Sequence, residues 1–178
     1  MLEIEVKIKI EEVESVSQKI TAQGALLTKE RYLEDNTLYD FPSQLLYKKN
    51  QALRLRKINR KTFLAFKGPP QKSRKFKVRE EYETEVKNAK QLKKILKSIG
   101  LIPVFNYKKH RTIYRKKNLK ICLDETQAGN FIELEGERSD IVRFAKALGF
   151  SKREFIKSDY IQLLKDKNEN IKRNNRQK

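Results

Sequence analysis

The chain opens with the stretch MLEIEVKIKI, residues 1–10, in which apolar and charged residues alternate from Leu2 onward. Such alternation predicts a β-strand with one buried face, because successive side chains of a strand point to opposite sides of the sheet. The polar face of this strand carries Glu3, Glu5 and Lys7 in one row. The role of this strand's polar face therefore depends on which part of the protein or solvent the row of charged side chains faces.

The pattern of the opening strand returns twice. Residues 79–86 (REEYETEV) and 130–137 (NFIELEGE) also carry a Glu-x-Glu pair among apolar neighbours. Each of the three segments precedes an amphipathic stretch that ends in glycine, at 11–24, 88–100 and 138–149. Apolar residues at helical spacing followed by glycine predict a helix and its C-terminal stop. The sequence thus predicts three units of strand, helix and glycine.

Further strands are predicted between these units. They lie at 26–40, 51–58, 62–68, 104–116 and 119–126. With the three above they predict an α+β fold of about eight antiparallel strands in two similar halves, with three or four helices outside the sheet. We expect one domain over 1–165, a C-terminal helix over 151–167, and a polar, basic, frayed tail at 166–178.

Composition and charge restrict the class of protein. The formal net charge of the 178 residues is +19, which either keeps the protein soluble or serves an anionic partner such as nucleic acid. No apolar run is long enough to span a membrane, and a charged strand at the N-terminus does not resemble a secretory signal. Cys122 is the single cysteine and predicts a core thiol in a cytoplasmic protein.

Several kinds of site are excluded. One histidine, His110, and one cysteine cannot form a Cys/His zinc site. Neither GxxxxGK[ST] nor GxGxxG occurs, which argues against a P-loop or Rossmann phosphate site. Alternation along its strand predicts that His110 points away from the side chains of Lys109 and Arg111.

Charged side chains are grouped strand by strand along the polar faces. A solvated sheet face explains any one strand, but nearly every predicted strand shows the pattern. If the sheet curls with its helices outside, these faces line a lumen, and a curled sheet of about eight strands removes its exposed edges by closing. Buried carboxylates would then require divalent cations, and buried basic side chains would require an anion such as a phosphate chain. This combination indicates a metal-dependent enzyme that acts on triphosphates.

The motifs also resemble a known family. EIEVK at 3–7 is similar to the ExExK signature of the CYTH superfamily, the triphosphate tunnel metalloenzymes. The likeness continues in family order through DNTLYD (35–40), ALRLRK (52–57), TFLAFKGP (62–69), REEYETEV (79–86), KHRTIY (109–114), LDET (123–126), GNFIELEGE (129–137) and SDYIQLL (158–164). The resemblance implies a closed tunnel of eight antiparallel strands. It also implies a CyaB-like class IV adenylyl cyclase or a thiamine or inorganic triphosphatase.

The resemblance assigns roles to individual residues. The phosphate grip, and thus the catalytic set, comprises Lys7, Arg54, Arg56, Lys67, Lys109 and Arg111. Mg²⁺ or Mn²⁺ would be held by Glu3, Glu5, Glu133 and Glu135, with Asp124 assisting. Arg79, Glu81 and Glu83 match the charged fifth strand and are assigned to cofactor binding. The expected partner is ATP, thiamine triphosphate or inorganic triphosphate, not nucleic acid or a membrane, and a homodimer is compatible with the pattern.

Three alternatives stay open at this stage. A cyclase and a hydrolase need the same grip and metals, and they differ in the register of the phosphates and in the presence of a base-binding pocket. A non-catalytic protein that binds RNA or polyphosphate would also use the basic excess. The loop over 68–77 is either a solvated loop or a lid over the mouth of the tunnel.

Tyr160 is expected to pack against its neighbours or to orient one of them.

Overall fold

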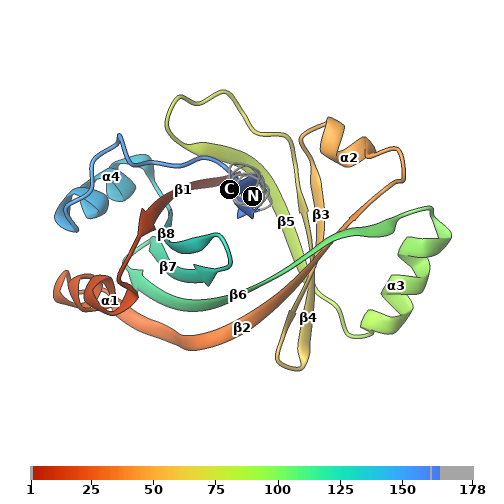
Figure 1. The fold of residues 1–178 in the computed structure, drawn as a ribbon, viewed down its shortest axis with the longest axis horizontal. Coiled ribbons are helices and arrows are strands. Elements are labelled where there is room, and N and C mark those ends of the chain that lie inside the picture. The colour runs from red at the N-terminus through yellow and green to blue at the C-terminus, as the bar shows by residue number, and fades with distance from the viewer. Residues whose placement is uncertain (1, 161, 165–178) are drawn as a thin grey trace, which may run out of the picture.

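The computed structural model describes residues 2–160 and 162–164 of the chain. Eight antiparallel strands close into a barrel in the order β1-β5-β4-β3-β2-β6-β7-β8 (Figure 1). The strands are β1 (Leu2–Ile10), β2 (Leu26–Asp40), β3 (Ala52–Ile58), β4 (Lys61–Lys67), β5 (Lys77–Glu85), β6 (Ile102–Lys116), β7 (Leu119–Thr126) and β8 (Gly129–Glu135). The prediction of a closed eight-stranded barrel is confirmed.

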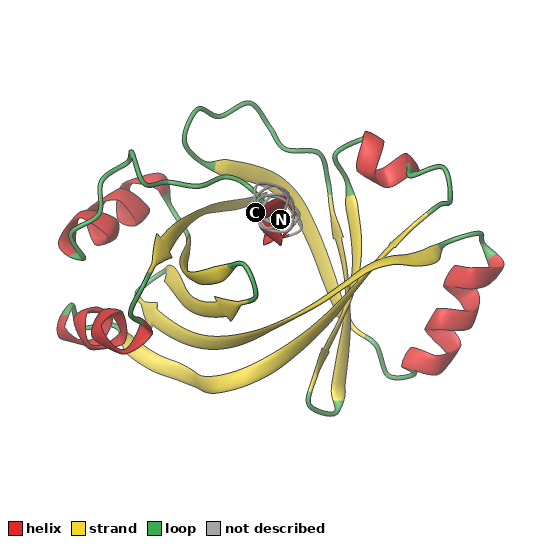
Figure 2. Cartoon of the chain, in the orientation of Figure 1, coloured by secondary structure: helices red, strands yellow, loops and turns green. Residues whose placement is uncertain are grey.

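The helices lie outside the barrel, as predicted (Figure 2). They are α1 (Val13–Ala22), α2 (Leu45–Lys48), α3 (Ala89–Ser98) and α4 (Arg138–Ala147). The four-residue α2 was not predicted, because it is too short to show an apolar period. In the described part of the chain, no helix is long and apolar enough to cross a membrane.

The two halves of the chain repeat one arrangement of elements. The first half runs β1-α1-β2-β3-β4, apart from the short α2, and the second runs β5-α3-β6-β7-β8. The leading strands β1 and β5 have 9 residues each, the helices α1 and α3 have 10, and the long strands β2 and β6 have 15. Equivalent strands also pair with each other, β1 with β5 and β2 with β6. This agrees with the predicted two similar halves.

The apolar core lies between the barrel wall and the helices. Val6 and Ile8 of β1 are fully buried in one cluster with Ile20 of α1 and with Ile141 and Phe144 of α4. A smaller cluster lies beneath α2 and α3 and includes Tyr39, Leu55, Leu96 and Leu101. Because alternate side chains of each strand point to opposite sides, an apolar outer face leaves the charged face on the lumen.

The predicted C-terminal helix over 151–167 is only partly correct. Residues 151–159 are not helical, and helical conformation is described at 160 and 162–164. The backbone of Ile156 instead pairs with Lys7 through two hydrogen bonds of 3.0 and 2.8 Å. Strand β5 pairs with β1 only over Leu2–Glu5, so this contact supplies a partner to an otherwise free strand edge. The rest of the predicted helix and the tail at 166–178 lie outside the described residues.

We predict that Ile141→Ala strongly destabilises the protein. Ile141 of α4 is 0% exposed, and truncation of such a side chain leaves a cavity that costs about 2–5 kcal/mol. Ile95→Ala in α3 is the control, since Ile95 is 56% exposed and its truncation should change the free energy of unfolding by under about 0.5 kcal/mol. Urea denaturation measures both values, and equal losses would contradict the assigned core.

Candidate functional site

The lumen contains a cavity of about 550 Å³ with charged walls. All but one of the site residues assigned from the sequence line this cavity. They are Glu3, Glu5, Lys7, Arg54, Arg56, Lys67, Arg79, Glu81, Glu83, Lys109, Arg111, Glu133 and Glu135. Asp124 does not line it and lies beneath Arg111 and Lys109. The barrel therefore gathers residues from β1, β3, β4, β5, β6 and β8 into one site.

Lys7 lies between two buried carboxylates. Its Nζ is 3.2 Å from Oε1 of Glu5 and 3.0 Å from Oε2 of Glu133. Burial alone would raise the pKa of Glu5, but the charges of Lys7 and Lys77 outweigh it and hold this pKa below its usual range. All these groups are therefore charged at neutral pH, and each is stabilised by its partners.

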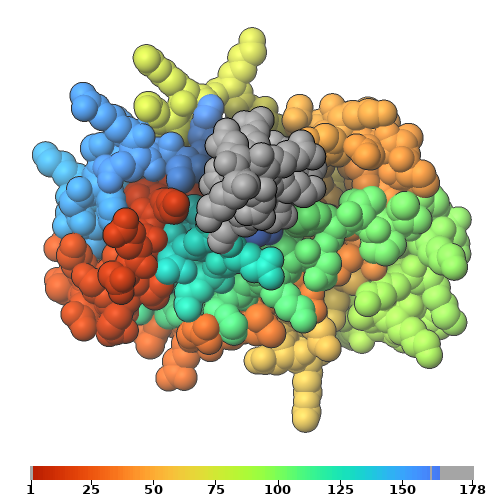
Figure 3. Space-filling model, in the orientation of Figure 1, coloured from red at the N-terminus to blue at the C-terminus, as the bar shows by residue number. Residues whose placement is uncertain are grey.

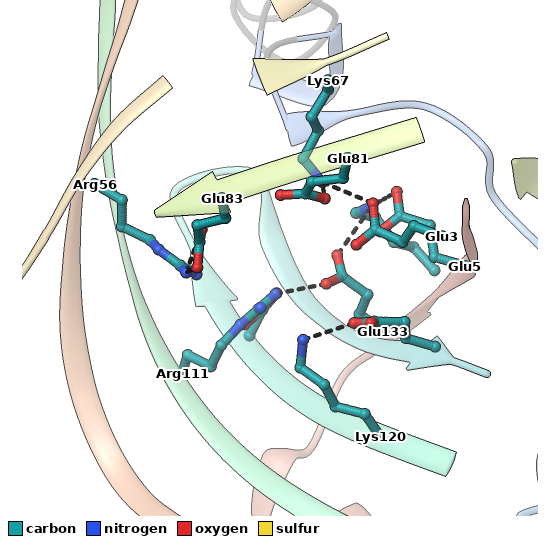
Figure 4. A network of polar contacts seen from close by, with 12 residues as sticks. Glu3, Glu5, Arg56, Lys67, Glu81, Glu83, Arg111, Lys120 and Glu133 are labelled. Carbon is teal, nitrogen blue, oxygen red and sulfur yellow. Dashed lines mark hydrogen bonds and ion pairs between the residues drawn. The ribbon is translucent and has the colours of Figure 1, made fainter. Parts of the chain in front are cut away.

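Asp124 organises the bases of the second half of the barrel. It accepts hydrogen bonds from Nε and Nη2 of Arg111 at 2.6 and 2.5 Å and from Nζ of Lys109 at 3.0 Å. It also accepts one from the hydroxyl of Tyr160 at 2.5 Å. Arg111 in turn donates to Glu133 at 2.7 Å (Figure 4). These contacts favour a role for Asp124 in holding cationic side chains, and its predicted role at a metal stays a prediction.

A second group of bases lies on β3. Nη2 of Arg56 is 2.7 Å from both carboxylate oxygens of Glu83, and Nη2 of Arg54 is 3.5 Å from Glu81. Among the described residues, the Nε atoms of Arg54, Arg56 and Arg79 are buried without a hydrogen-bond partner. A buried donor without an acceptor is costly, so these atoms suit an anionic ligand with several oxygens.

Glu3 and Glu81 form a carboxyl pair above Lys67. Burial, the hydrogen bond with Glu81 and the charge of Glu5 raise the pKa of Glu3 to about 8, against the opposing effect of Lys67 at 2.9 Å. Burial would also raise the pKa of Glu81, but the bond with Glu3 and the charge of Lys67 lower it to about 2. The pair therefore shares one proton at neutral pH.

This carboxyl pair provides a test of whether a metal fits. In the part of the chain that the structure describes, no three acidic, cysteine or histidine side chains converge as a metal centre. Mg²⁺, however, is commonly held by one or two carboxylates together with substrate phosphates. Glu3 and Glu81 offer only carboxylate oxygens. The shared proton relieves the repulsion between these two carboxylates, and a bound cation would do the same. Their donor chemistry fits Mg²⁺ or Mn²⁺.

A second cavity of about 670 Å³ adjoins the lumen. It lies between α2, the 68–76 loop and residues 157–160, and Lys77, Arg79 and Asp159 line both cavities. Its walls combine apolar and amide side chains, namely Leu46, Phe76, Val104, Phe105, Gln44, Asn50, Gln51, Gln71 and Gln162. Long side chains of the loop also project from the molecule near the top of Figure 3. The loop thus forms a wall of this cavity, and its motion as a lid stays a prediction.

The geometry agrees with the family likeness. A model of the CYTH domain family matches residues 1–161. The chain belongs to the CYTH family. A protein of Methanocaldococcus jannaschii that is named as a candidate adenylate cyclase is 29% identical over 92% of this chain and 98% of its own length.

Solved structures share the fold. A candidate adenylate cyclase from Vibrio parahaemolyticus superposes with a TM-score of 0.83 at 20% identity, over 93% of this chain and 98% of that one. A protein from Hippeastrum, described as a candidate adenylyl cyclase with a dominant triphosphatase activity, superposes with a TM-score of 0.66 at 20% identity, over 92% and 95% of the two chains. These two structures therefore share the fold of this chain.

Sequence analysis assigned no role to several charged residues inside the barrel. Lys120 pairs with Glu135 at 2.6 Å, and its position four residues before Asp124 on β7 is a signal that could have identified it. Glu34 is fully buried, 3.3 Å from Arg56, and alternation along β2 would have placed it inward. Lys77 lies 3.5 Å from Glu5, two residues before the assigned Arg79. No spacing rule identifies these three as partners, because each pairing crosses strands.

We predict that Glu3→Gln stabilises the protein increasingly as the pH rises from about 5 to 9. The unfolded chain loses the Glu3 proton near the ordinary pKa of 4.5, whereas the folded protein keeps it up to about pH 8. Wild-type stability from this group is therefore full below about pH 4.5 and is lost as the pH rises through 8. Glutamine cannot ionise, so the variant should melt at least about 3 °C above wild type at pH 9.

The same comparison should give little difference at pH 5. Thermal unfolding is measured with EDTA present, so that no cation occupies the pair. Glu85→Gln is the control, because Glu85 is about half exposed and contacts the exposed Lys61. A stability gain for Glu3→Gln that does not change with pH would refute the shared proton.

Proposed function

We propose that this CYTH protein is a Mg²⁺- or Mn²⁺-dependent triphosphatase that acts on an organic triphosphate. The observation that carries the proposal is the lumen itself, in which buried lysines and arginines from opposite walls converge around a cavity of about 550 Å³. A linear triphosphate carries enough charged oxygens to engage several such bases at once. The Hippeastrum relative, with its dominant triphosphatase activity, supports the reaction type.

The chain's own groups can bind and polarise the phosphates. Arg54, Arg56 and Arg79 have buried Nε atoms directed to no protein acceptor in the described residues, and Lys109 and Arg111 lie on the neighbouring wall. Fixed donors of this kind stabilise the charge that develops on the phosphoryl oxygens. Hydrolysis joins a water oxygen to the terminal phosphorus and breaks its bond to the bridging oxygen, so that orthophosphate and a diphosphate form. The proton of the water passes to a lumen carboxylate.

The CYTH family is in general metal-dependent. Here Glu3 and Glu81, with Glu5 beside them, would hold Mg²⁺ or Mn²⁺, which neutralises phosphate charge and polarises the phosphoryl group. Glu133 and Glu135 are ion-paired with Lys7, Arg111 and Lys120, and the metal role that the sequence assigns to them stays a prediction.

The second cavity favours an organic substituent on the triphosphate. It meets the lumen at Lys77 and Arg79, and its amide and aromatic side chains suit a heterocyclic ring with polar edges. The same cavity supports a second candidate function, an adenylyl cyclase, and the name of the Methanocaldococcus jannaschii relative points the same way. A cyclase would direct a ribose hydroxyl, not water, at the α-phosphorus and release pyrophosphate.

Product identification separates these reactions. The protein is incubated with ATP, thiamine triphosphate or inorganic triphosphate, each with Mg²⁺ and with Mn²⁺. We expect orthophosphate with a diphosphate product, faster for an organic triphosphate than for the inorganic one, and none with EDTA. Cyclic AMP and pyrophosphate would establish the cyclase instead. If the triphosphates bind tightly, EDTA does not weaken this binding and no product forms, the protein is better described as a non-catalytic binder of RNA or polyphosphate.

We predict that triphosphate raises the melting temperature through Arg54. A ligand at about 100 times its Kd that binds only the folded state adds about 2.7 kcal/mol of stability. Arg54→Ala should remove most of this ligand-induced shift, whatever its effect on the unliganded protein. His110→Ala is the control, because His110 lies between Lys109 and Arg111 and faces away from the lumen. An undiminished shift in Arg54→Ala would mean that the phosphates lie elsewhere.

A further inference from the structure

Tyr160 is brought into the lumen by the segment that follows α4. This segment is fixed at three points before it reaches the lumen. Phe155 packs edge-on against Phe76 at 6.0 Å between ring centroids, the backbone of Ile156 pairs with Lys7, and Nζ of Lys157 donates to the carbonyl of Ser73 at 2.9 Å. Tyr160 is thereby held in place by contacts distant from its own ring.

The ring of Tyr160 lies among the bases of the site. Nζ of Lys7 is 5.0 Å and Nζ of Lys109 is 4.6 Å from the ring centroid, and Phe131 contacts the ring edge-on at 5.7 Å. Tyr160 is only 5% exposed. Ammonium groups at this distance are attracted to an aromatic face, most strongly where water is excluded. The ring therefore stabilises the positions of two lysines that come from different strands, β1 and β6.

The hydroxyl of Tyr160 donates one of the hydrogen bonds that hold the carboxylate of Asp124. Oδ2 of Asp124 accepts from Lys109, from Nη2 of Arg111 and from the phenol, whereas Oδ1 accepts from Nε of Arg111. A phenol is protonated at neutral pH and can only donate to a carboxylate. Because Asp124 fixes the planar guanidinium of Arg111 through two bonds, a shift of this carboxylate would re-aim Arg111.

We propose that Tyr160 is a positioning residue of the phosphate-binding array. Its hydroxyl fixes Asp124, and through Asp124 it fixes Lys109 and Arg111 in the orientation that receives a triphosphate. The site is then not made by the barrel alone, since the segment after α4 supplies one of its supports. This inference rests on the proposed triphosphate-binding function.

The test compares two buried tyrosines in the full chain. Tyr160→Phe removes the hydroxyl and keeps the ring. Tyr114→Phe is the matched control, since Tyr114 is also 5% exposed and its hydroxyl is 2.7 Å from Ser17 of α1, on the outer face of the barrel. Inorganic triphosphate with Mg²⁺ is titrated into each protein by calorimetry. We expect Tyr160→Phe to raise Kd about tenfold, or about 1.4 kcal/mol, and Tyr114→Phe to leave Kd unchanged.

A double-mutant cycle asks whether the effect passes through Asp124. We expect Asp124→Asn to weaken triphosphate binding and the double variant Tyr160→Phe/Asp124→Asn to be no weaker than Asp124→Asn alone. If Tyr160→Phe does not fold, Phe155→Ala replaces it, because this variant loosens the segment's anchor on Phe76 without altering a lumen residue, and the same loss of affinity is expected.

The outcomes separate this inference from the proposed function. Wild-type protein that binds triphosphate, together with Tyr160→Phe that binds equally well, overturns the positioning role and leaves the triphosphate site intact. Losses that multiply in the double variant also overturn it, because Tyr160 would then act independently of Asp124. Wild-type protein that binds no triphosphate overturns the proposed function, and the positioning role with it.

Discussion

The structure depends on the mutual neutralisation of charges inside a closed barrel. A lone ion in such a lumen would be strongly unfavourable, and most of the ions here are offset by opposite charges. Lys7 has Glu5 and Glu133, Arg111 has Asp124 and Glu133, and Arg56 has Glu34 and Glu83. The lumen therefore stays charged at neutral pH, which is the state that a phosphate-binding site requires. The exception is the pair Glu3 and Glu81, which shares a proton.

This balance explains why metal and triphosphate belong together in the proposed function. A phosphate chain that takes hydrogen bonds from Arg54 or Arg56 competes with Glu81 and Glu83 for the same donors. Carboxylates released in this way need a new counter-charge, and a divalent cation provides one. In the proposed function, phosphate oxygens would thus replace the carboxylates as partners of the arginines, and a metal would replace the proton and ammonium groups beside the carboxylates.

The net charge of +19 has a different meaning once the fold is known. Acids and bases line the lumen in similar numbers, so the surplus lies mostly outside this cavity. Composition by itself favours a nucleic-acid partner, whereas the arrangement of the lumen favours a small ligand that brings both anionic oxygens and a cation. Exposed lysines such as Lys93 and Lys94 of α3 contribute to the charge without contributing to the site.

The sequence by itself determined the strands, the main helices and the polar face of each strand. Strand alternation and helical spacing are local patterns that can be read within a few consecutive residues. Glu3, Glu5 and Lys7 could therefore be placed together on the polar face of one strand from ten residues of sequence. Only the tertiary structure decided which charges meet. Lys7 faces Glu133 through the register of β1 and β8, and Arg111 faces Asp124 through the register of β6 and β7. The place of Tyr160 and the second cavity were decided in the same way, since both depend on a segment that returns to the barrel from a distant part of the chain. Barrel closure and strand register are set by packing across the whole molecule, and no short stretch of sequence contains that information.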